Sequence, residues 1–214
     1  MATAKQSNVV ELKQLRLAKH YIPIFGTSPL IMHAWSHKAK QAMLDKQMKK
    51  ATAGKVAKDP QRDFEESIYV GKDGLPAFPT VAFKAAAVDA AAAMDFRKTN
   101  LRQSFHIEGD MVSIIGDDPQ PREDMVRVGM GTADIRYRAQ FEHWAALLPV
   151  TINTGMLSIE QLVNLFDAAG FGIGIGEWRP QRDGQFGRFK VADDAERKLI
   201  EQWSKQREKA GRAA

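Results

Sequence analysis

Few side chains in this sequence combine a reactive type with a spacing that supports chemistry. The chain has five histidines and no cysteine, which excludes disulfides, thiolate catalysis and zinc–thiolate sites. His33 and His37 stand four residues apart, a spacing that can hold a metal ion on one face of a helix. Ser36 is expected to cap that helix, which leaves His33 outside it. Because no third ligand stands nearby, we predict no metal site.

A glycine-rich stretch is the second candidate for chemistry. Residues 170–191 read GFGIGIGEWRPQRDGQFGRFKV and contain six glycines. A dinucleotide-binding fingerprint follows a strand and opens a helix, whereas here a helix is expected before the stretch and a strand after it. The sequence also has no P-loop lysine motif and no G-x-S-x-G elbow. The pattern therefore predicts no small-molecule cofactor and no catalytic residue.

This stretch, called the glycine segment (residues 170–191), has the composition of a surface that binds nucleic acid. Glycines let a backbone approach a ligand closely and let N–H groups face phosphate oxygens. Trp178 and Phe186 carry rings on which bases can stack. The alternative is a bulged loop with both rings in the core; we expect Trp178 to be exposed and Phe186 to be buried. The candidate binding residues here are Gly174, Gly176, Trp178, Arg179, Arg182, Arg188 and Lys190.

The positive charge of the chain is gathered in clusters. The net charge is +5, and residues 38–58 hold seven lysines and one acidic residue. Residues 196–212 hold six basic and three acidic residues. Such clusters attract phosphate backbones, or they form an ordinary solvated face, and both interpretations stay open. Lys49 and Lys50 of the first cluster join the candidate nucleic-acid-binding residues.

Hydropathy indicates no membrane partner. The sequence contains no run of about 18 apolar residues, the length that a transmembrane helix requires. The first residues lack the apolar region of a signal peptide. We therefore expect a cytoplasmic protein, which is consistent with the absence of cysteine.

Hydrophobic periodicity predicts short strands and helices in irregular alternation, which favours an α+β fold over a doubly wound parallel sheet. The predicted strands are 14–24, 67–70, a hairpin over 105–115, 125–128, 135–137, 144–152 and 186–191. The predicted helices are 36–52, an alanine-rich buried helix that Thr80 would cap, 158–169, and a basic helix from 193 onward.

Several single residues refine these boundaries. Ser158 and Gln161 form a capping box, and Gly170 is expected to end the helix that they open. Pro149 suggests that the strand 144–152 lies at a sheet edge or carries a bulge. Residues 53–62 are polar and are expected to form a loop.

Three motifs, in this order, resemble the RAMP superfamily of RNA-binding proteins, the ferredoxin-like (RRM-like) subunits of CRISPR effector complexes. The likeness is strongest to the repeated backbone subunit that coats the guide RNA. Pro79, Phe83 and Lys84 match the proline, apolar and lysine positions of the second motif, whereas Ala85 and Val88 replace its usual glycine and arginine. The motifs are IPIFGTSPLIMH, GLPAFPTVAFKAAAVDAAA and FGIGIGEWRPQRDGQFGRFKV.

We expect a single domain over residues 1–214, and the resemblance covers most of residues 15–191. Its ferredoxin-like core would span 15–191, with a lysine-rich helical insertion at 36–66 and a basic C-terminal helix at 192–214. The resemblance also implies a phosphate contact from Lys84. The chain further looks like uncharacterised proteins of bacteriophages and prophages, which would make it a solitary relative of the CRISPR subunits.

Three functional hypotheses follow. The first is a non-catalytic protein that binds single-stranded RNA or DNA and forms a helical or ring-shaped homo-oligomer along it. In a phage it would coat or anneal strands for recombination, or interfere with a host CRISPR complex. The second is a RAMP-type endoribonuclease with His20 or His33 as its histidine. The third is a structural or interaction protein whose basic faces bind an acidic protein partner.

Overall fold

The protein is built around a five-stranded antiparallel sheet, in which four strands have the order β10-β1-β9-β4 and the short strand β6 also pairs with β9. The computed structural model describes residues 14–35, 37–50, 57–128 and 131–213. Helix α3 lies in the chain between β1 and β4, and α5 lies between β9 and β10, which is the β-α-β-β-α-β order of a ferredoxin-like fold. The predicted α+β class and ferredoxin-like core are confirmed. The core elements are β1 (Leu17–Gly26), α3 (Thr80–Ala90), β4 (Phe105–Ile107), β9 (Trp144–Asn153), α5 (Ile159–Gly172) and β10 (Phe189–Val191).

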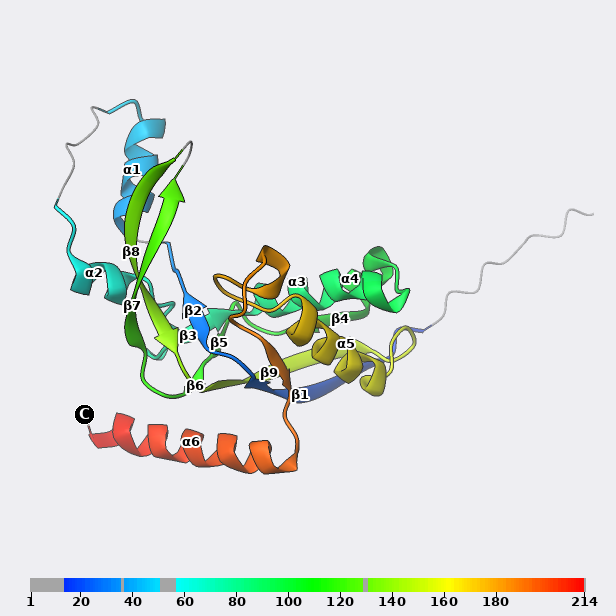
Figure 1. The fold of residues 1–214 in the computed structure, drawn as a ribbon. Coiled ribbons are helices and arrows are strands. Elements are labelled where there is room, and N and C mark those ends of the chain that lie inside the picture. The colour runs from blue at the N-terminus through cyan, green and yellow to red at the C-terminus, as the bar shows by residue number, and fades with distance from the viewer. Residues whose placement is uncertain (1–13, 36, 51–56, 129–130, 214) are drawn as a thin grey trace, which may run out of the picture.

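Helices cover the two faces of this sheet unequally. Figure 1 shows α3, α4 (Lys98–Ser104) and α5 on one face and the long helix α6 (Asp194–Ala213) on the other. The main core lies under α3 and α5, where Phe83, Phe105 and Phe166 are almost fully buried. A second, small core under α6 holds Ala145 and Ile200. The expected basic C-terminal helix is therefore present and packs on the sheet.

Close packing explains the residue types of α3 and α5. Ala86, Ala87 and Ala90 of α3 are buried, as the alanine-rich sequence predicted. The Ser158–Gln161 capping box opens α5 as expected. Gly170 does not end α5, which continues to Gly172. Its role is steric instead, because a β-carbon at Gly170 would lie 1.8 Å from the carbonyl oxygen of Phe189 in β10.

A second sheet projects from the core. It has the order β2-β8-β7, and its two long strands form a ribbon, called the β7–β8 ribbon (residues 120–141). Figure 1 shows this ribbon rising away from the central sheet beside the insertion helices α1 and α2. The remaining bounds are β2 (Leu30–Met32), α1 (His37–Gln47), α2 (Pro60–Glu66), β7 (Gln120–Val128) and β8 (Thr132–Phe141), together with β3 (Ala77–Pro79), β5 (Met111–Ser113), β6 (Ile115–Gly116), η1 (Ala91–Met94) and η2 (Pro180–Arg182).

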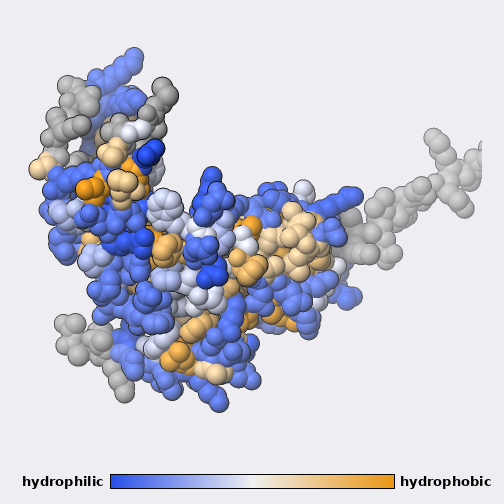
Figure 2. Space-filling model, in the orientation of Figure 1, coloured by the Kyte–Doolittle hydropathy of each residue, from blue (hydrophilic) through white to orange (hydrophobic). Residues whose placement is uncertain are grey.

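Charged side chains are buried on one face of the β7–β8 ribbon, and the opposite face exposes two apolar side chains. Asp124 and Arg138 are buried, whereas Met125 is 71% exposed and pairs across the ribbon with the exposed Ile135. Figure 2 shows apolar residues among hydrophilic ones over this part of the molecule. The insertion helix α1 likewise leaves its apolar residues Met43 and Leu44 exposed, and Met48 is exposed directly after it.

Some predicted strands were wrong because local pattern does not identify the pairing partner. Residues 67–70 form no strand; Val70 makes only an isolated bridge to Pro76. Residues 105–115 are not a hairpin, since β4 pairs with β9 and β5 pairs with β3. The final strand is also shorter than expected, because β10 begins only at Phe189.

Two single residues and one expected loop differ from their predictions. Thr80 is the first residue of α3 rather than its cap, and its hydroxyl donates to the carbonyl of Gly109 at 2.5 Å. Pro149 lies in β9, which is an inner strand between β1 and β4. It falls between the residues of β9 that pair with β4 and those that pair with β6. The expected loop 53–62 gives way to α2 at Pro60, with Asp59 as its cap.

Some expectations fall on parts of the chain without a described structure. Ser36, the expected cap of the first helix, and residues 51–56 of the lysine-rich insertion lie outside the described residues. Within the described residues, no helix has both the length and the apolar composition that crossing a membrane would require.

Candidate nucleic-acid interface

The glycine segment leaves α5 and crosses the top of α3 before it enters β10. At several of its glycines the protein's own backbone leaves no room for a β-carbon. A β-carbon at Gly176 would lie 2.5 Å from the carbonyl oxygen of Ile31, and one at Gly187 would lie 1.8 Å from that of Ile175. Both have positive φ angles, +77° and +64°, which side chains rarely tolerate. The expected reason for these glycines was ligand approach, whereas here they permit close contact between segments of the chain.

The backbone N–H groups of the segment also point inward. Glu177 donates to the carbonyl of Ile31 at 3.1 Å, and Gly187 donates to that of Pro29 at 2.7 Å. These bonds bind the segment to the turn after β1 and to β2. The backbone of the glycine segment is therefore held in place by the protein itself. A ligand would contact its side chains rather than its backbone N–H groups.

A cavity of about 340 Å³ lies between the glycine segment and α3. Val81, Ala82 and Ala85 of α3 line one wall, and Gly174 and Gly176 line the opposite wall. Since alanine side chains end at the β-carbon, this part of α3 leaves space that a larger residue would fill. Polar side chains stand around the cavity: His33, Tyr69, Asp89, Glu177, Arg179 and Gln181.

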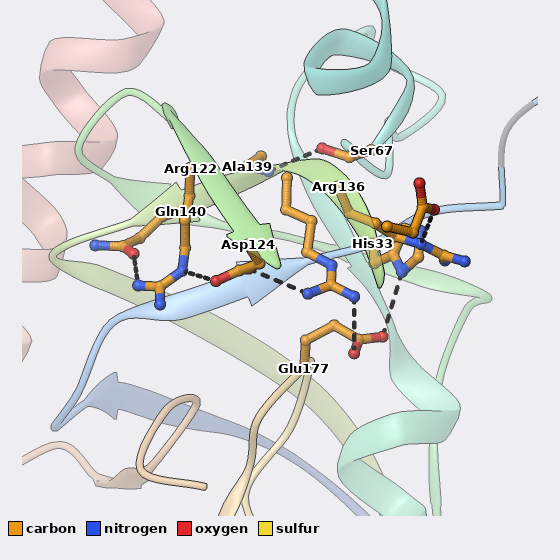
Figure 3. A network of polar contacts seen from close by, with 10 residues as sticks. His33, Ser67, Arg122, Asp124, Arg136, Ala139, Gln140 and Glu177 are labelled. Atoms are coloured by element: carbon orange, nitrogen blue, oxygen red, sulfur yellow. Dashed lines mark hydrogen bonds and ion pairs between the residues drawn. The ribbon is translucent and has the colours of Figure 1, made fainter. Parts of the chain in front are cut away.

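A buried ionic network holds one edge of the cavity in place (Figure 3). The side chain of Arg138, which is 5% exposed, donates to Asp124 Oδ2 at 3.1 Å and faces Glu177 Oε2 at 3.7 Å. Glu177 Oε1 lies 3.5 Å from Nδ1 of His33. Arg122 binds the other oxygen of Asp124 at 2.8 Å. The network thus joins the β7–β8 ribbon to the glycine segment and to the residue after β2.

The environment of Glu177 favours its charged form. The contact with His33, followed by the charges of Arg138 and Arg179, holds the pKa of Glu177 below its usual value, although burial opposes this. Burial also raises the pKa of Tyr69 at the same cavity, and the negative charge of Glu177 adds to that increase. The cavity edge therefore carries a fixed negative charge between cationic groups.

This arrangement predicts an acid-sensitive contribution to stability. A carboxylate whose pKa is lowered by folding stabilises the protein above its unfolded pKa, and this contribution is lost as the pH falls through the folded pKa. We expect the free energy of unfolding to fall less steeply in Glu177→Gln than in the wild type between about pH 6 and pH 3. Urea unfolding of both proteins across that range measures this difference in the free energy of unfolding. Parallel pH profiles of the two proteins would contradict the stabilising role of the Glu177 carboxylate.

Trp178 and its neighbours are the exposed part of the segment. Trp178 is 42% exposed, as predicted, and has a φ of 52°. Arg179 also lines the cavity, and its guanidinium donates to the carbonyl of Gly176 at 3.1 Å. Arg182 is exposed on the short helix η2. The structure thus brings together Gly174, Gly176, Trp178, Arg179 and Arg182 of the predicted site.

Phe186 and Arg188, two further candidates of the segment, are both partly buried. Phe186 is half-buried, and the guanidinium of Arg122 lies over its ring at 4.7 Å from the centroid. Arg188 is partly buried, and its Nε has no hydrogen-bond partner among the described residues. The ring of Phe186, a candidate for base stacking, is therefore already in contact with Arg122 of the β7–β8 ribbon.

The predicted lysines lie away from the cavity. Lys84 points from α3 toward β4, where its ammonium donates to the carbonyl of Arg102 at 3.1 Å and lies 3.1 Å from His106 Nδ1; burial lowers its pKa. Lys190 forms ion pairs with Asp193 and Glu196 at the start of α6. Lys49 and Lys50 are exposed where α1 ends. Their role in binding stays a prediction.

The two histidines of the endoribonuclease alternative are placed differently. His33 lines the cavity and contacts Glu177, whereas His20 lies within β1 opposite Val150. His20 is half-buried, and the endoribonuclease alternative with either histidine stays a prediction. Among the described residues, no group of three or more histidine, cysteine or acidic side chains is arranged to hold a metal ion.

The ionic network was missed from the sequence. The signal was present in the ribbon, where Arg122, Asp124, Arg138 and Gln140 occupy alternate positions of two paired strands and so share one face. A charged face is ordinarily the solvent face, and only the fold shows that the glycine segment covers it.

Comparison with known proteins gives limited similarity. No protein-family model matches the chain, and no curated protein matches it. Among solved structures, the crystal structure of Cmr6 from Pyrococcus furiosus aligns with a TM-score of 0.44 and 10% sequence identity. The alignment covers 84% of this chain and 100% of that chain.

Proposed function

We propose that this protein binds single-stranded nucleic acid without catalysis, and that the surface around Trp178 is its main contact. The observation that carries the proposal is the conformation of Trp178. A bulky residue with a positive φ is an outlier that costs about 1–3 kcal/mol, and such strain gathers at functional sites. Here the strain holds a large aromatic ring at the surface, where it is 42% exposed.

The neighbourhood of Trp178 supplies what a nucleic-acid strand needs. Arg179 and Arg182 stand close to it in the chain and provide positive charge for phosphates. The cavity beside Arg179, about 340 Å³, lies within the range of small-ligand sites, which begins at about 300 Å³. Its alanine wall and polar edge suit an unstacked base, because a base combines apolar faces with hydrogen-bonding edges. The three RAMP-like sequence motifs support the same kind of ligand.

The proposal extends to assembly. A chain of this size covers few nucleotides, so a homo-oligomer along the strand would gain affinity through multivalency. The exposed apolar residues of the β7–β8 ribbon, Met125 and Ile135, are candidates for contacts between neighbouring copies. A role in phage recombination or in a CRISPR-related process belongs to the same proposal.

The test uses fluorescence anisotropy of labelled single-stranded RNA and DNA. Since base–aromatic stacking contributes about 1–3 kcal/mol, we expect Trp178→Ala to weaken binding at least fivefold and Trp178→Phe to retain most of it. Trp35→Ala is the matched control, because Trp35 is 56% exposed and lies after β2. Affinity should fall steeply with salt.

Three outcomes separate the hypotheses. If the wild-type protein fails to bind single strands at low salt, the proposal is wrong and protein partners become the better hypothesis. If Trp178→Ala and Trp35→Ala bind alike, Trp178 is not the contact. RNA that is cut during the titration, but stays intact with His33→Ala, would favour the endoribonuclease alternative.

A further inference from the structure

The face of the central sheet that α6 crosses is only partly covered. The odd-numbered residues of β1 point to this face, and Phe25 stacks on Trp203 of α6 with ring centroids 5.9 Å apart. Toward the start of β1, beyond α6, this face is exposed as far as the described residues go. Tyr21 is 71% exposed there and Leu17 is 60% exposed. A large aromatic ring therefore stands uncovered in the middle of a strand on an open sheet.

A second cavity lies between this open half and α6. Its volume is about 490 Å³, which is sufficient for a nucleotide-sized ligand. Tyr21, Pro23 and Leu147 form its sheet side, and Arg197 and Lys205 of α6 stand on its helix side. Figure 2 shows a small apolar area where α6 meets the sheet, bordered by hydrophilic residues. The cavity thus has an apolar floor and cationic groups on one wall.

The charges around this cavity favour an anionic ligand. Lys19 lies two residues before Tyr21 in β1 and points to the same face. Among the described residues, Lys19, Arg197 and Lys205 take part in no ion pair. Within the part of the chain that the structure describes, Glu201 is the one acidic residue lining the cavity. Lysine is depleted at the cores of protein–protein interfaces, so a lysine beside the exposed tyrosine argues against a protein partner here.

We propose that this open sheet face is a base-stacking platform for single-stranded nucleic acid. Tyr21 stacks against a base, while Arg197 and Lys205 contact the adjacent phosphates. The chemistry is general: an aromatic ring on an exposed sheet offers its face to any base, and flanking cations follow the backbone. The inference rests on the proposed function for its ligand class. It adds a second contact surface, on the opposite face of the sheet from α3 and α5.

The proposal has a geometric consequence. The Trp178 surface belongs to the glycine segment above α3, whereas the platform lies under the sheet beside α6 (Figure 1). A strand that reaches both must pass around the edge of the domain. The two sites therefore bind the same oligonucleotide only if it is long. With the shortest oligonucleotides, the affinity of each site is measured separately.

The experiment compares Tyr21→Ala and Tyr21→Phe in anisotropy titrations with homopolymeric uridine and thymidine oligonucleotides. We expect Tyr21→Ala to weaken binding about tenfold and Tyr21→Phe to bind like the wild type. Lys205→Glu should weaken binding too and should reduce its salt dependence. Trp35→Ala is the matched control, since Trp35 is 56% exposed and lines neither cavity, and its loss should leave affinity unchanged. Because Tyr21 is largely exposed, thermal unfolding should be the same for the wild type and both variants.

The outcomes distinguish this inference from the proposed function. Wild-type binding that Trp178→Ala weakens and Tyr21→Ala does not would overturn the platform and leave the proposed function standing. No wild-type binding would overturn both. A change in the sedimentation of the ligand-free protein on Tyr21→Ala, with unchanged affinity per protomer, would show that the face binds a second copy instead. A photo-crosslink from 5-bromouridine RNA to the peptide containing Tyr21 would support the platform directly.

Discussion

Replacing Gly170 by alanine is expected to lower the free energy of unfolding by about 3 kcal/mol or more. The added β-carbon would lie 1.8 Å from the carbonyl oxygen of Phe189 and 2.6 Å from its ring atom Cδ2. Neither the helix nor the strand can move away freely, because β10 is paired with β1 and Phe189 is buried against Phe83 and Trp144. We therefore expect β10 to be displaced and the glycine segment before it to shift.

The matched control lies two residues further along the same helix. Gly172 has nothing within 4 Å of the position where its β-carbon would be placed. Because alanine is the better helix former, Gly172→Ala should stabilise the protein by about 0.5 kcal/mol. Urea unfolding of both variants measures the contrast. Similar effects of the two substitutions would mean that helix propensity, rather than contact with β10, decides the residue at 170.

The second large effect is expected from Asp124→Asn in the buried ionic network. This change keeps the shape of the side chain but removes the charge that faces Arg138, whose side chain is 5% exposed. Breaking a buried ion pair by neutralising one partner costs about 3–5 kcal/mol, because the other charge is left without compensation in a poorly solvated site. Glu177 lies 3.7 Å from Arg138 and is 41% exposed, so it compensates only in part. We expect a loss of about 3 kcal/mol.

Asp134→Asn is the control for this prediction. Asp134 lies on the same face of the β7–β8 ribbon and pairs with Lys58 and Arg136, but its side chain is 33% exposed. Exposed pairs contribute about 0–1 kcal/mol, so its loss should be small. A double change, Asp124→Leu with Arg138→Met, should be more stable than Asp124→Asn alone, because it removes both buried charges. Equal costs for Asp124→Asn and Asp134→Asn would contradict the role of the network.

The sequence predicted those features that depend on local pattern. The strand at β1, the capping box of α5 and the buried alanine-rich helix all appear as expected. Each of these features depends on residues that stand two to four positions apart, so the local sequence is sufficient to predict it. The ferredoxin-like strand order was anticipated through motif resemblance, since periodicity alone does not specify which strands pair.

Features that depend on tertiary contacts were not predictable. The hairpin expected at 105–115 fails because β4 and β5 find separate partners, and Gly170 looked like a helix stop because its steric neighbour, Phe189, lies in another element. In the candidate site, too, a local feature was predictable and a tertiary contact was not. The exposure of Trp178 followed from its charged neighbours in the sequence, whereas the link from Glu177 to Arg138 and His33 needs three separate elements to meet.

The strand order of the central sheet has a consequence for folding. Among the described residues, β1 pairs only with β9 and β10, which come from much later in the chain. Such non-local pairing raises the contact order and slows folding, since a long loop must close before the contacts form. During synthesis on a ribosome, β1 would emerge first and remain an unpaired strand until β9 follows. In that interval its exposed edges are open to association with other nascent chains.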